Sequence, residues 1–187
     1  EVQTCSAPVY AVVRESMRNT LIEAIEHALI AQYGTDPLHS ENFCKIINEK
    51  HFQRLSELAP QAQTDEACNK IAPTFIELGT IKSKKVSASP LMQEEIFGPI
   101  LPIITYTNID DVVSFINNRN KPLALYLFTK EKNVVKKITT YVQYGGGCIN
   151  DVIFHVSTDK MPFGGIGESG MGRYHGKASF DTFTHFK

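Results

Sequence analysis

The sequence lacks several features that mark particular classes of protein. It contains no tryptophan, and only four of its 187 residues are cysteine, with no Cys-x-x-Cys pair among them. No apolar run is long enough to span a bilayer, so a membrane segment is not indicated. The 19 lysines and arginines nearly balance the 20 aspartates and glutamates, so no excess of positive charge attracts nucleic acid. The remaining expectation is a globular protein that acts on small molecules.

The sparse thiols and histidines also bear on compartment and metal content. The four cysteines, at positions 5, 44, 68 and 148, are sparse and irregularly spaced. This spacing favours reduced thiols in a cytoplasmic protein over a disulfide framework. The six histidines show no metal-ligand spacing such as His-Glu-x-x-His, so no metal site is expected. The sequence begins without methionine and without a signal pattern, which favours a piece of a longer protein.

The second half of the chain has the more regular pattern. Apolar strand-like runs at 99–106, 123–129 and 147–151 alternate with amphipathic helical patterns at 109–118 and 131–142. This β-α-β-α-β order predicts parallel strands covered by helices, and we expect the three strands to lie in one sheet. The first half is less regular. Its predicted elements are a strand at 8–13, helices at 16–33 and 41–58, the second in one or two pieces, and a strand at 71–77.

A glycine-rich stretch, PFGGIGESGMG at 162–172, contains the spelling of a dinucleotide-binding fingerprint, Gly165-x-Gly167-x-x-Gly170. That fingerprint needs a strand before it, a helix after it and an acidic residue about 20 positions further on. Here a polar segment with Pro162 precedes it, and the chain ends 17 residues after Gly170. We therefore expect the glycines to let the backbone turn tightly against a close neighbour, not to bind phosphate.

Several segments in order along the chain resemble the aldehyde dehydrogenase superfamily. They are QTC at 3–5, MQEEIFGPILPI at 92–103, KPLALYLF at 121–128 and PFGGIGESGMGRYHGKASFDTFTH at 162–185. The last resembles the class 3 and fatty aldehyde dehydrogenase branch. The resemblance implies an α/β fold, the three-layer parallel-sheet catalytic domain of this family, without most of the Rossmann-type cofactor domain. It implies one catalytic domain over 1–187, in which 152–187 include the returning glycine-rich and C-terminal segment.

Cys5 is the candidate nucleophile. A thiolate adds to an aldehyde to give a thiohemiacetal, and loss of hydride leaves a thioester that water cleaves. Taken alone, a cysteine is more often a small core residue; the resemblance implies the catalytic role. The other three cysteines are expected to be structural.

Further site residues follow from the same resemblance. Glu95, which alone reads as part of a solvated acidic turn, would hold the nicotinamide ribose of NAD or NADP, because a carboxylate accepts from two hydroxyls. Phe97 would pack beside the nicotinamide ring. Asn150, His155 and Phe163 would belong to the aldehyde pocket. Asn150 could equally cap a loop, and a lone histidine is more often a surface residue.

The implied function is oxidation of a fatty or aromatic aldehyde to a carboxylic acid by a cytoplasmic enzyme that is a homodimer at full length. The family's general-base glutamate and oxyanion asparagine precede the cysteine, so this chain alone is expected to be inactive. The alternative is a non-catalytic structural or interaction protein that retains this half-fold. The missing cofactor domain favours that alternative, as does Val2, which stands where the family usually has glycine.

Overall fold

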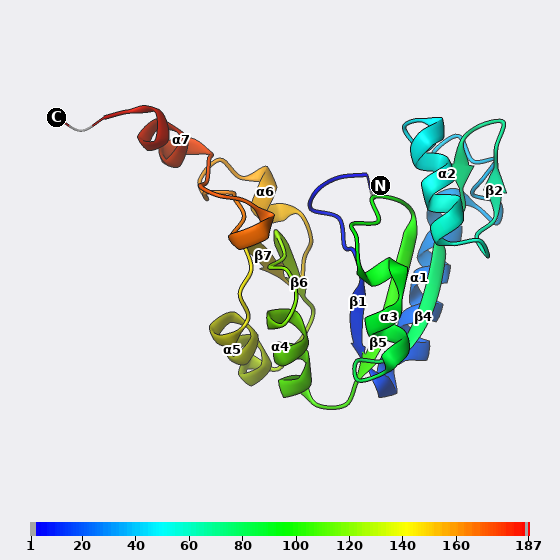
Figure 1. The fold of residues 1–187 in the computed structure, drawn as a ribbon, viewed down its shortest axis with the longest axis horizontal. Coiled ribbons are helices and arrows are strands. Elements are labelled where there is room, and N and C mark those ends of the chain that lie inside the picture. The colour runs from blue at the N-terminus through cyan, green and yellow to red at the C-terminus, as the bar shows by residue number, and fades with distance from the viewer. Residues whose placement is uncertain (1–2, 186) are drawn as a thin grey trace. The chain divides into compact units, whose positions relative to one another are not determined.

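The computed structural model describes residues 3–185 and 187, so Val2 lies outside the described residues. The chain divides into two compact units, Glu1–Thr107 and Asn108–Lys187, called here the first and second units (Figure 1). The expectation of one catalytic domain over 1–187, with 152–187 as its returning segment, stays a prediction. No helix within the described residues is long and apolar enough to cross a membrane.

The first unit is built on a three-stranded parallel sheet. Its strands are β1 (Ala11–Arg14), β4 (Thr74–Thr80) and β5 (Ile100–Tyr106), in the order β1-β5-β4. The central strand β5 is almost continuously apolar, and Ile103 and Ile104 are at most 1% exposed. Such a run is typical of a parallel strand covered on both faces. This strand is therefore the centre of the first unit's core.

Helices and a small hairpin complete the first unit. The helices are α1 (Arg18–Tyr33), which follows η1 (Glu15–Met17), α2 (Glu49–Leu58) and α3 (Lys84–Ala88), which precedes η2 (Pro90–Met92). The hairpin pairs β2 (Thr64–Asp65) with β3 (Lys70–Ile71). Of the helix predicted at 41–58, only the second part forms. The side chain of Asn48 accepts a hydrogen bond from the His51 amide at 3.0 Å, and this cap begins α2.

The second unit contains the predicted alternation of helices and strands. Its elements are α4 (Ile109–Asn117), β6 (Ala124–Leu127), α5 (Lys132–Tyr141) and β7 (Gly146–Ile149), and β6 pairs with β7 in parallel. The expectation that 99–106 shares a sheet with these two strands is wrong. β1 and β4 occupy both edges of β5, and β6 and β7 form a separate two-stranded sheet. Hydrophobic periodicity identified the strands but does not specify which strands pair. The two partners of β5, which are β1 and β4, lie in the less regular first half of the chain.

The C-terminal part of the second unit folds closely upon itself. It contains α6 (Phe154–Ser157), η3 (Gly167–Ser169) and α7 (Gly176–Phe183). A Cβ atom on Gly164 would lie 2.2 Å from the Gly172 carbonyl oxygen, and one on Gly165 would lie 2.1 Å from the Ser169 carbonyl oxygen. The glycines thus permit the tight turn expected from the sequence.

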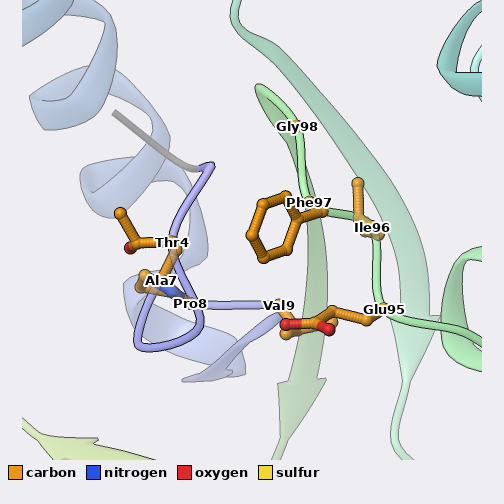
Figure 2. Close-up of a pocket in the computed structure, with 8 residues that line it drawn as sticks. All are labelled: Thr4, Ala7, Pro8, Val9, Glu95, Ile96, Phe97 and Gly98. Atoms are coloured by element: carbon orange, nitrogen blue, oxygen red, sulfur yellow. The ribbon is translucent and has the colours of Figure 1, made fainter. Parts of the chain in front are cut away.

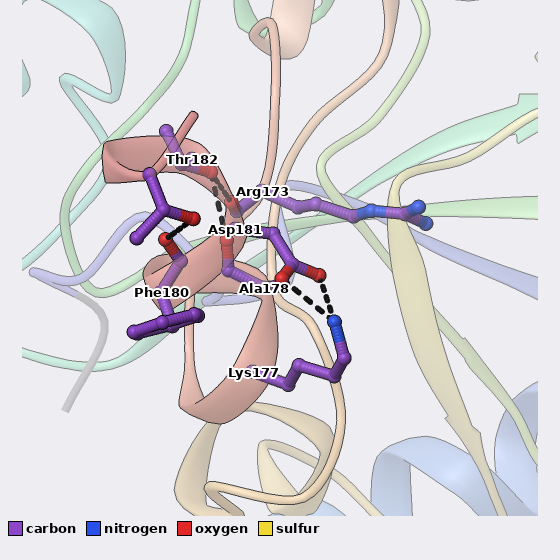
Figure 3. A network of polar contacts seen from close by, with 7 residues as sticks. Arg173, Lys177, Ala178, Phe180, Asp181 and Thr182 are labelled. Carbon is purple, nitrogen blue, oxygen red and sulfur yellow. Dashed lines mark hydrogen bonds and ion pairs between the residues drawn. The ribbon is translucent and has the colours of Figure 1, made fainter. Parts of the chain in front are cut away.

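Helix α7 depends on its own polar side chains, because none of its residues is buried. Lys177 Nζ lies 2.6 Å from Asp181 Oδ1, one turn further along, and the Thr182 hydroxyl donates to the Ala178 carbonyl at 2.8 Å (Figure 3). The i,i+4 ion pair contributes about 0.2–0.5 kcal/mol to an exposed helix.

Candidate active site

The segment that carries Cys5 is a turn in front of β1. Its ends are held by backbone and side-chain bonds: the Ala7 amide donates to the Thr4 carbonyl at 3.1 Å. The Gln3 side chain accepts from the Ile47 amide and donates to the Lys45 carbonyl, both at 3.0 Å. Cys5 itself is exposed, and its Sγ lies 3.8 Å from the Ser6 hydroxyl oxygen. The thiol therefore stands on an anchored turn and is open to a reagent.

A hollow lies between this turn and the segment that carries Glu95 (Figure 2). Segment 4–9 supplies Thr4, Ala7, Pro8 and Val9, and segment 95–98 supplies Glu95, Ile96, Phe97 and Gly98. The Phe97 ring and the Glu95 carboxylate both point toward segment 4–9 (Figure 2). Cys5 is not among the residues that line the hollow, although Thr4 beside it is. Two sequence motifs separated by some 90 positions thus lie side by side.

The backbone of segment 95–98 has a special conformation. Phe97 has a φ of +54°, in the left-handed region that non-glycine residues seldom occupy. A Cβ on Gly98 would lie 2.5 Å from a methyl carbon of Leu55, which is fully buried on α2. Glycine is therefore required for the close approach of this segment to α2. Ile96 is 2% exposed, so it anchors the segment while Phe97, 39% exposed, faces the hollow.

Sequence reasoning missed Arg54 on α2. Its Nη2 donates to the Ile96 carbonyl at 2.6 Å, and its Nη1 lies 3.3 Å from a Glu94 carboxylate oxygen. The only sequence signal was a basic residue on the face of a predicted helix, and that pattern occurs on most solvent-exposed helices.

The second unit brings His155 and Phe163 together in an aromatic group. The His155 ring lies 5.7 Å from the ring centres of both Tyr126 and Phe163, and its Nδ1 lies 3.5 Å from Cys148 Sγ. His155 is 5% exposed and Phe163 7%. Burial lowers the pKa of His155 below its ordinary value, because the protonated ring loses hydration. A neutral, buried imidazole is therefore part of an apolar wall, and Nε2 has no hydrogen-bond partner within the described residues.

Asn150 has a different environment, just beyond the end of β7. Its Oδ1 accepts from the Thr129 amide at 2.8 Å, and its Nδ2 donates to the Thr129 carbonyl at 3.0 Å. Its φ of +56° is one that asparagine tolerates better than most residues. The side chain thus continues the pairing of β6 and β7 past their ends. Of the two interpretations left open by the sequence, this geometry describes the capping amide, and the pocket role stays a prediction.

The predicted site residues therefore fall into two groups. Cys5, Glu95 and Phe97 belong to the first unit, and Asn150, His155 and Phe163 belong to the second. Within residues 3–185 and 187, no three His, Cys, Asp or Glu side chains are grouped so as to hold a metal ion.

Comparison with known proteins relates these groups to one family. The profile of the aldehyde dehydrogenase family matches residues 2–187. The chain is 46% identical to the 4,4'-diaponeurosporen-aldehyde dehydrogenase of Staphylococcus aureus, over 99% of this chain and 41% of that protein. It is 46% identical to human aldehyde dehydrogenase family 3 member B1, over 99% of this chain and 40% of that protein. It is 42% identical to the mouse dimeric NADP-preferring aldehyde dehydrogenase, over 98% of this chain and 40% of that protein.

Solved structures give the same result for the fold. A substrate-bound Staphylococcus aureus AldH superimposes with a TM-score of 0.90 at 44% identity, covering 98% of this chain and 40% of that one. An NAD-dependent aldehyde dehydrogenase from Sinorhizobium meliloti gives 0.81 at 25% identity, over 99% and 38%. The predicted α/β fold class and the class 3 resemblance are confirmed, and the chain spans about 40% of the length of these relatives. The chain belongs to the aldehyde dehydrogenase family.

Proposed function

We propose that the intact protein containing this chain oxidises an aldehyde to a carboxylic acid with NAD or NADP, and that Cys5 is the nucleophile. The observation that carries the proposal is the hollow that joins the turn of Cys5 to segment 95–98 (Figure 2). Cys5 is exposed on an anchored turn, and a carboxylate and an aromatic ring face that turn from the opposite side. Family membership supports aldehyde oxidation in general.

The chemistry assigned to Cys5 balances as follows. Its thiolate forms a bond from sulfur to the aldehyde carbon, and the carbonyl oxygen takes the negative charge of the tetrahedral adduct. When that charge returns to a C=O bond, the carbon loses hydride and a thioester to Cys5 remains. Water then cleaves the carbon–sulfur bond, so that the acid leaves and the thiol is restored. The bound NAD or NADP supplies the acceptor for the hydride.

The residues of the hollow fit such a cofactor. Within the described residues, no hydrogen bond or ion pair engages the Glu95 carboxylate, which leaves its oxygens for two ribose hydroxyls. The half-exposed Phe97 ring offers an aromatic surface for a flat nicotinamide ring. Glu95 would hold the ribose and Phe97 would fix the plane of the ring.

The substrate and assembly are part of the proposal. The wall formed by Tyr126, His155 and Phe163 suits a fatty or aromatic aldehyde, because it is apolar and the imidazole is neutral. One relative, the mouse enzyme, is dimeric and prefers NADP, which supports a homodimer and is compatible with NADP as coenzyme. Four sparsely spaced cysteines with no Cys-x-x-Cys pair suit the reducing cytoplasm.

The test compares the intact protein with the 187-residue chain alone. Each is purified free of host dehydrogenases and supplied with a long-chain or aromatic aldehyde and with NAD or NADP, and NADH or NADPH formation is followed. The intact protein should be active and its Cys5→Ala variant inactive. The chain alone should be slower by a factor on the order of 10⁴, because a general base typically contributes about 10²–10⁴ and an oxyanion donor a comparable amount.

Two results would contradict the proposal. Equal activity of the chain alone would show that nothing beyond it is required. An intact protein without aldehyde-dependent coenzyme reduction would favour the alternative, a non-catalytic structural or interaction protein.

A further inference from the structure

We propose that Arg54 is a positioning residue for the coenzyme side of the site: it holds segment 94–98 so that Glu95 and Phe97 face the hollow. The inference rests on the proposed function, because it assumes that these two side chains meet NAD or NADP. Arg54 lies on α2 and does not line the hollow itself. Its effect would therefore pass through the backbone of the segment.

Arg54 contacts the residues on either side of Glu95 in the chain. On one side Nη1 lies 3.3 Å from the Glu94 carboxylate, and on the other Nη2 donates to the Ile96 carbonyl at 2.6 Å. The Arg54 side chain is only 29% exposed, whereas that of Glu94 is 53% exposed. The shorter and better-shielded contact is thus the one to the backbone. A planar guanidinium can bind both acceptors at once, which a lysine ammonium does with less geometric control.

The segment needs such an anchor because its conformation is unfavourable on its own. A φ of +54° at Phe97 persists only where the surroundings impose it. Leu55, the next residue on α2, packs against Gly98 so closely that a Cβ there would lie 2.5 Å from it. Arg54 and Leu55 therefore fix the two sides of Phe97, one by hydrogen bonding and the other by packing.

The same part of the chain anchors the nucleophile separately. Gln3 bonds to the Lys45 carbonyl and the Ile47 amide, just before α2 begins. Within the described residues, the side-chain bonds of Arg54 go to segment 94–98. Loss of Arg54 should consequently disturb coenzyme binding and leave the Cys5 turn in place. This separation gives a readout that general loss of stability would not reproduce.

The experiment uses the intact protein with Arg54→Met and Arg54→Lys. The KM for NAD and NADP is measured at saturating aldehyde. Hydrolysis of a 4-nitrophenyl ester is measured without coenzyme, since that reaction needs only acylation of Cys5 and attack by water. Arg54→Met should raise the coenzyme KM about 10-fold or more, because displacement of a binding group by about 1 Å is costly. Arg54→Lys should raise it less, and ester hydrolysis should stay unchanged in both.

Two further variants complete the design. Gln53→Ala is the matched control. Gln53 is the neighbour of Arg54 on α2, and among the described residues its side chain donates to Glu49 of the same helix at 2.9 Å, so all readouts should stay unchanged. In a Glu95→Gln background, the effect of Arg54→Met on the coenzyme KM should largely disappear, because both substitutions act on one interaction.

The outcomes separate the two proposals. If the unsubstituted protein reduces no coenzyme, the proposed function fails and the inference with it. If it is active but Arg54→Met leaves the coenzyme KM unchanged, only the inference is overturned. The same holds if Arg54→Met lowers the rate of ester hydrolysis by the same factor as it raises the coenzyme KM. If Arg54→Met does not fold, Arg54→Lys decides: a raised coenzyme KM with normal ester hydrolysis supports the positioning role, and an unchanged KM rejects it.

Discussion

The two units differ in how many of their large apolar side chains are exposed. In the first unit the exposed ones are few: Met17, Ile30, Ile47 and Phe97. In the second they are numerous, and they are Phe128, Tyr141, Ile149, Val152, Ile153, Phe154, Met161, Met171, Tyr174, Phe180 and Phe183. The sheets of the two units also differ. β5 is paired on both edges and its residues are nearly all buried, whereas every residue of β6 is half-buried.

This contrast shows that a core forms around a strand with two neighbours. A two-stranded sheet has no such strand and cannot bury both faces alone. Exposed apolar surface on this scale is typical of surface that is covered in an assembled protein. Met171, 97% exposed, and Phe183, 89% exposed, are its most solvent-accessible members. If the units also differ in function, substitutions in the first unit should affect catalysis, and substitutions in the second unit should affect mainly the free energy of unfolding.

The largest expected effect separates the thiols of the two units. In the intact protein, Cys5→Ala should lower coenzyme reduction by about 10⁴-fold or more, because Cys5 carries the thiol assigned to the covalent adduct. Cys148→Ala should leave the rate largely intact, since its contact is with the His155 ring at 3.5 Å. Steady-state rates with a saturating aldehyde measure both, and Cys44→Ala is a second control. A comparable loss in all three variants would indicate general instability instead.

The next effect compares glycines, one in each unit. A Cβ on Gly147 would lie 2.1 Å from the backbone oxygen of Leu125 in the paired strand, whereas one on Gly98 would meet only the side chain of Leu55. A side chain can adjust, and a paired backbone cannot. Gly147→Ala should therefore lower the free energy of unfolding by about 3 kcal/mol and Gly98→Ala by about 1–2 kcal/mol.

Urea unfolding followed by circular dichroism would measure both losses. Gly172→Ala serves as the control, because a Cβ there would meet nothing within 4 Å and only its φ of +74° opposes the change. A larger loss for Gly98→Ala than for Gly147→Ala would contradict the proposed difference between side-chain and backbone obstruction.

Most of the elements could be predicted from sequence, as could the parallel pairing of β6 with β7, but the pairing of β5 could not. The amphipathic pattern at 109–118 predicts a helix, and α4 forms there, with Asn108 as its cap and Val112 and Ile116 buried. The neighbours of β5 do not, because β1 and β4 come from 20 or more positions away and carry weaker patterns. Local periodicity predicts which face of an element is buried but contains no information on which strand lies beside it.

The site was predictable to the extent that motifs carry it. Cys5, Glu95 and Phe97 lie in short segments with a recognisable spelling, and the structure brings those segments to one hollow. Arg54 belongs to no recognisable sequence motif, and its contacts depend on how α2 packs against segment 94–98. The two hydrogen bonds between the Asn150 side chain and the Thr129 backbone could not be predicted from the sequence either, because they require the ends of β6 and β7 to lie in register.

A smaller effect concerns Asn150 itself. Asn150→Ala removes two hydrogen bonds to Thr129 and puts alanine, which tolerates the left-handed region less well than asparagine, at a φ of +56°. We expect a loss of about 2 kcal/mol, since each of these exposed bonds contributes about 0.5–1 kcal/mol and the strain at alanine adds the rest. Asn150→Gly removes the bonds without the strain and should cost less. Thermal unfolding of both variants measures the order, and equal losses would show that backbone strain plays no part.

The smallest effect is a pH dependence that belongs to the second unit. Burial lowers the pKa of His155 in the folded state below the ordinary value of 6.5. Between the lowered pKa and 6.5 the unfolded chain therefore binds more protons than the folded one. The stability contributed by the neutral ring is complete above about pH 6.5 and is lost as the pH falls below it.

His155→Phe isolates this contribution. The substitution removes the titrating group and keeps an aromatic ring beside Tyr126 and Phe163, so the variant loses the Cys148 contact at every pH alike. Urea unfolding of both proteins between about pH 5 and pH 8 gives the difference in their free energies of unfolding. The free energy of unfolding of the unsubstituted protein should fall relative to that of the variant as the pH falls through 6.5, because only the unsubstituted protein must keep a buried imidazole neutral. The other five histidines are the same in both proteins, so they cancel in the comparison. A difference that stays constant across the range would mean that His155 keeps its ordinary pKa in the fold, and the neutral apolar wall assigned to the second unit would then be wrong.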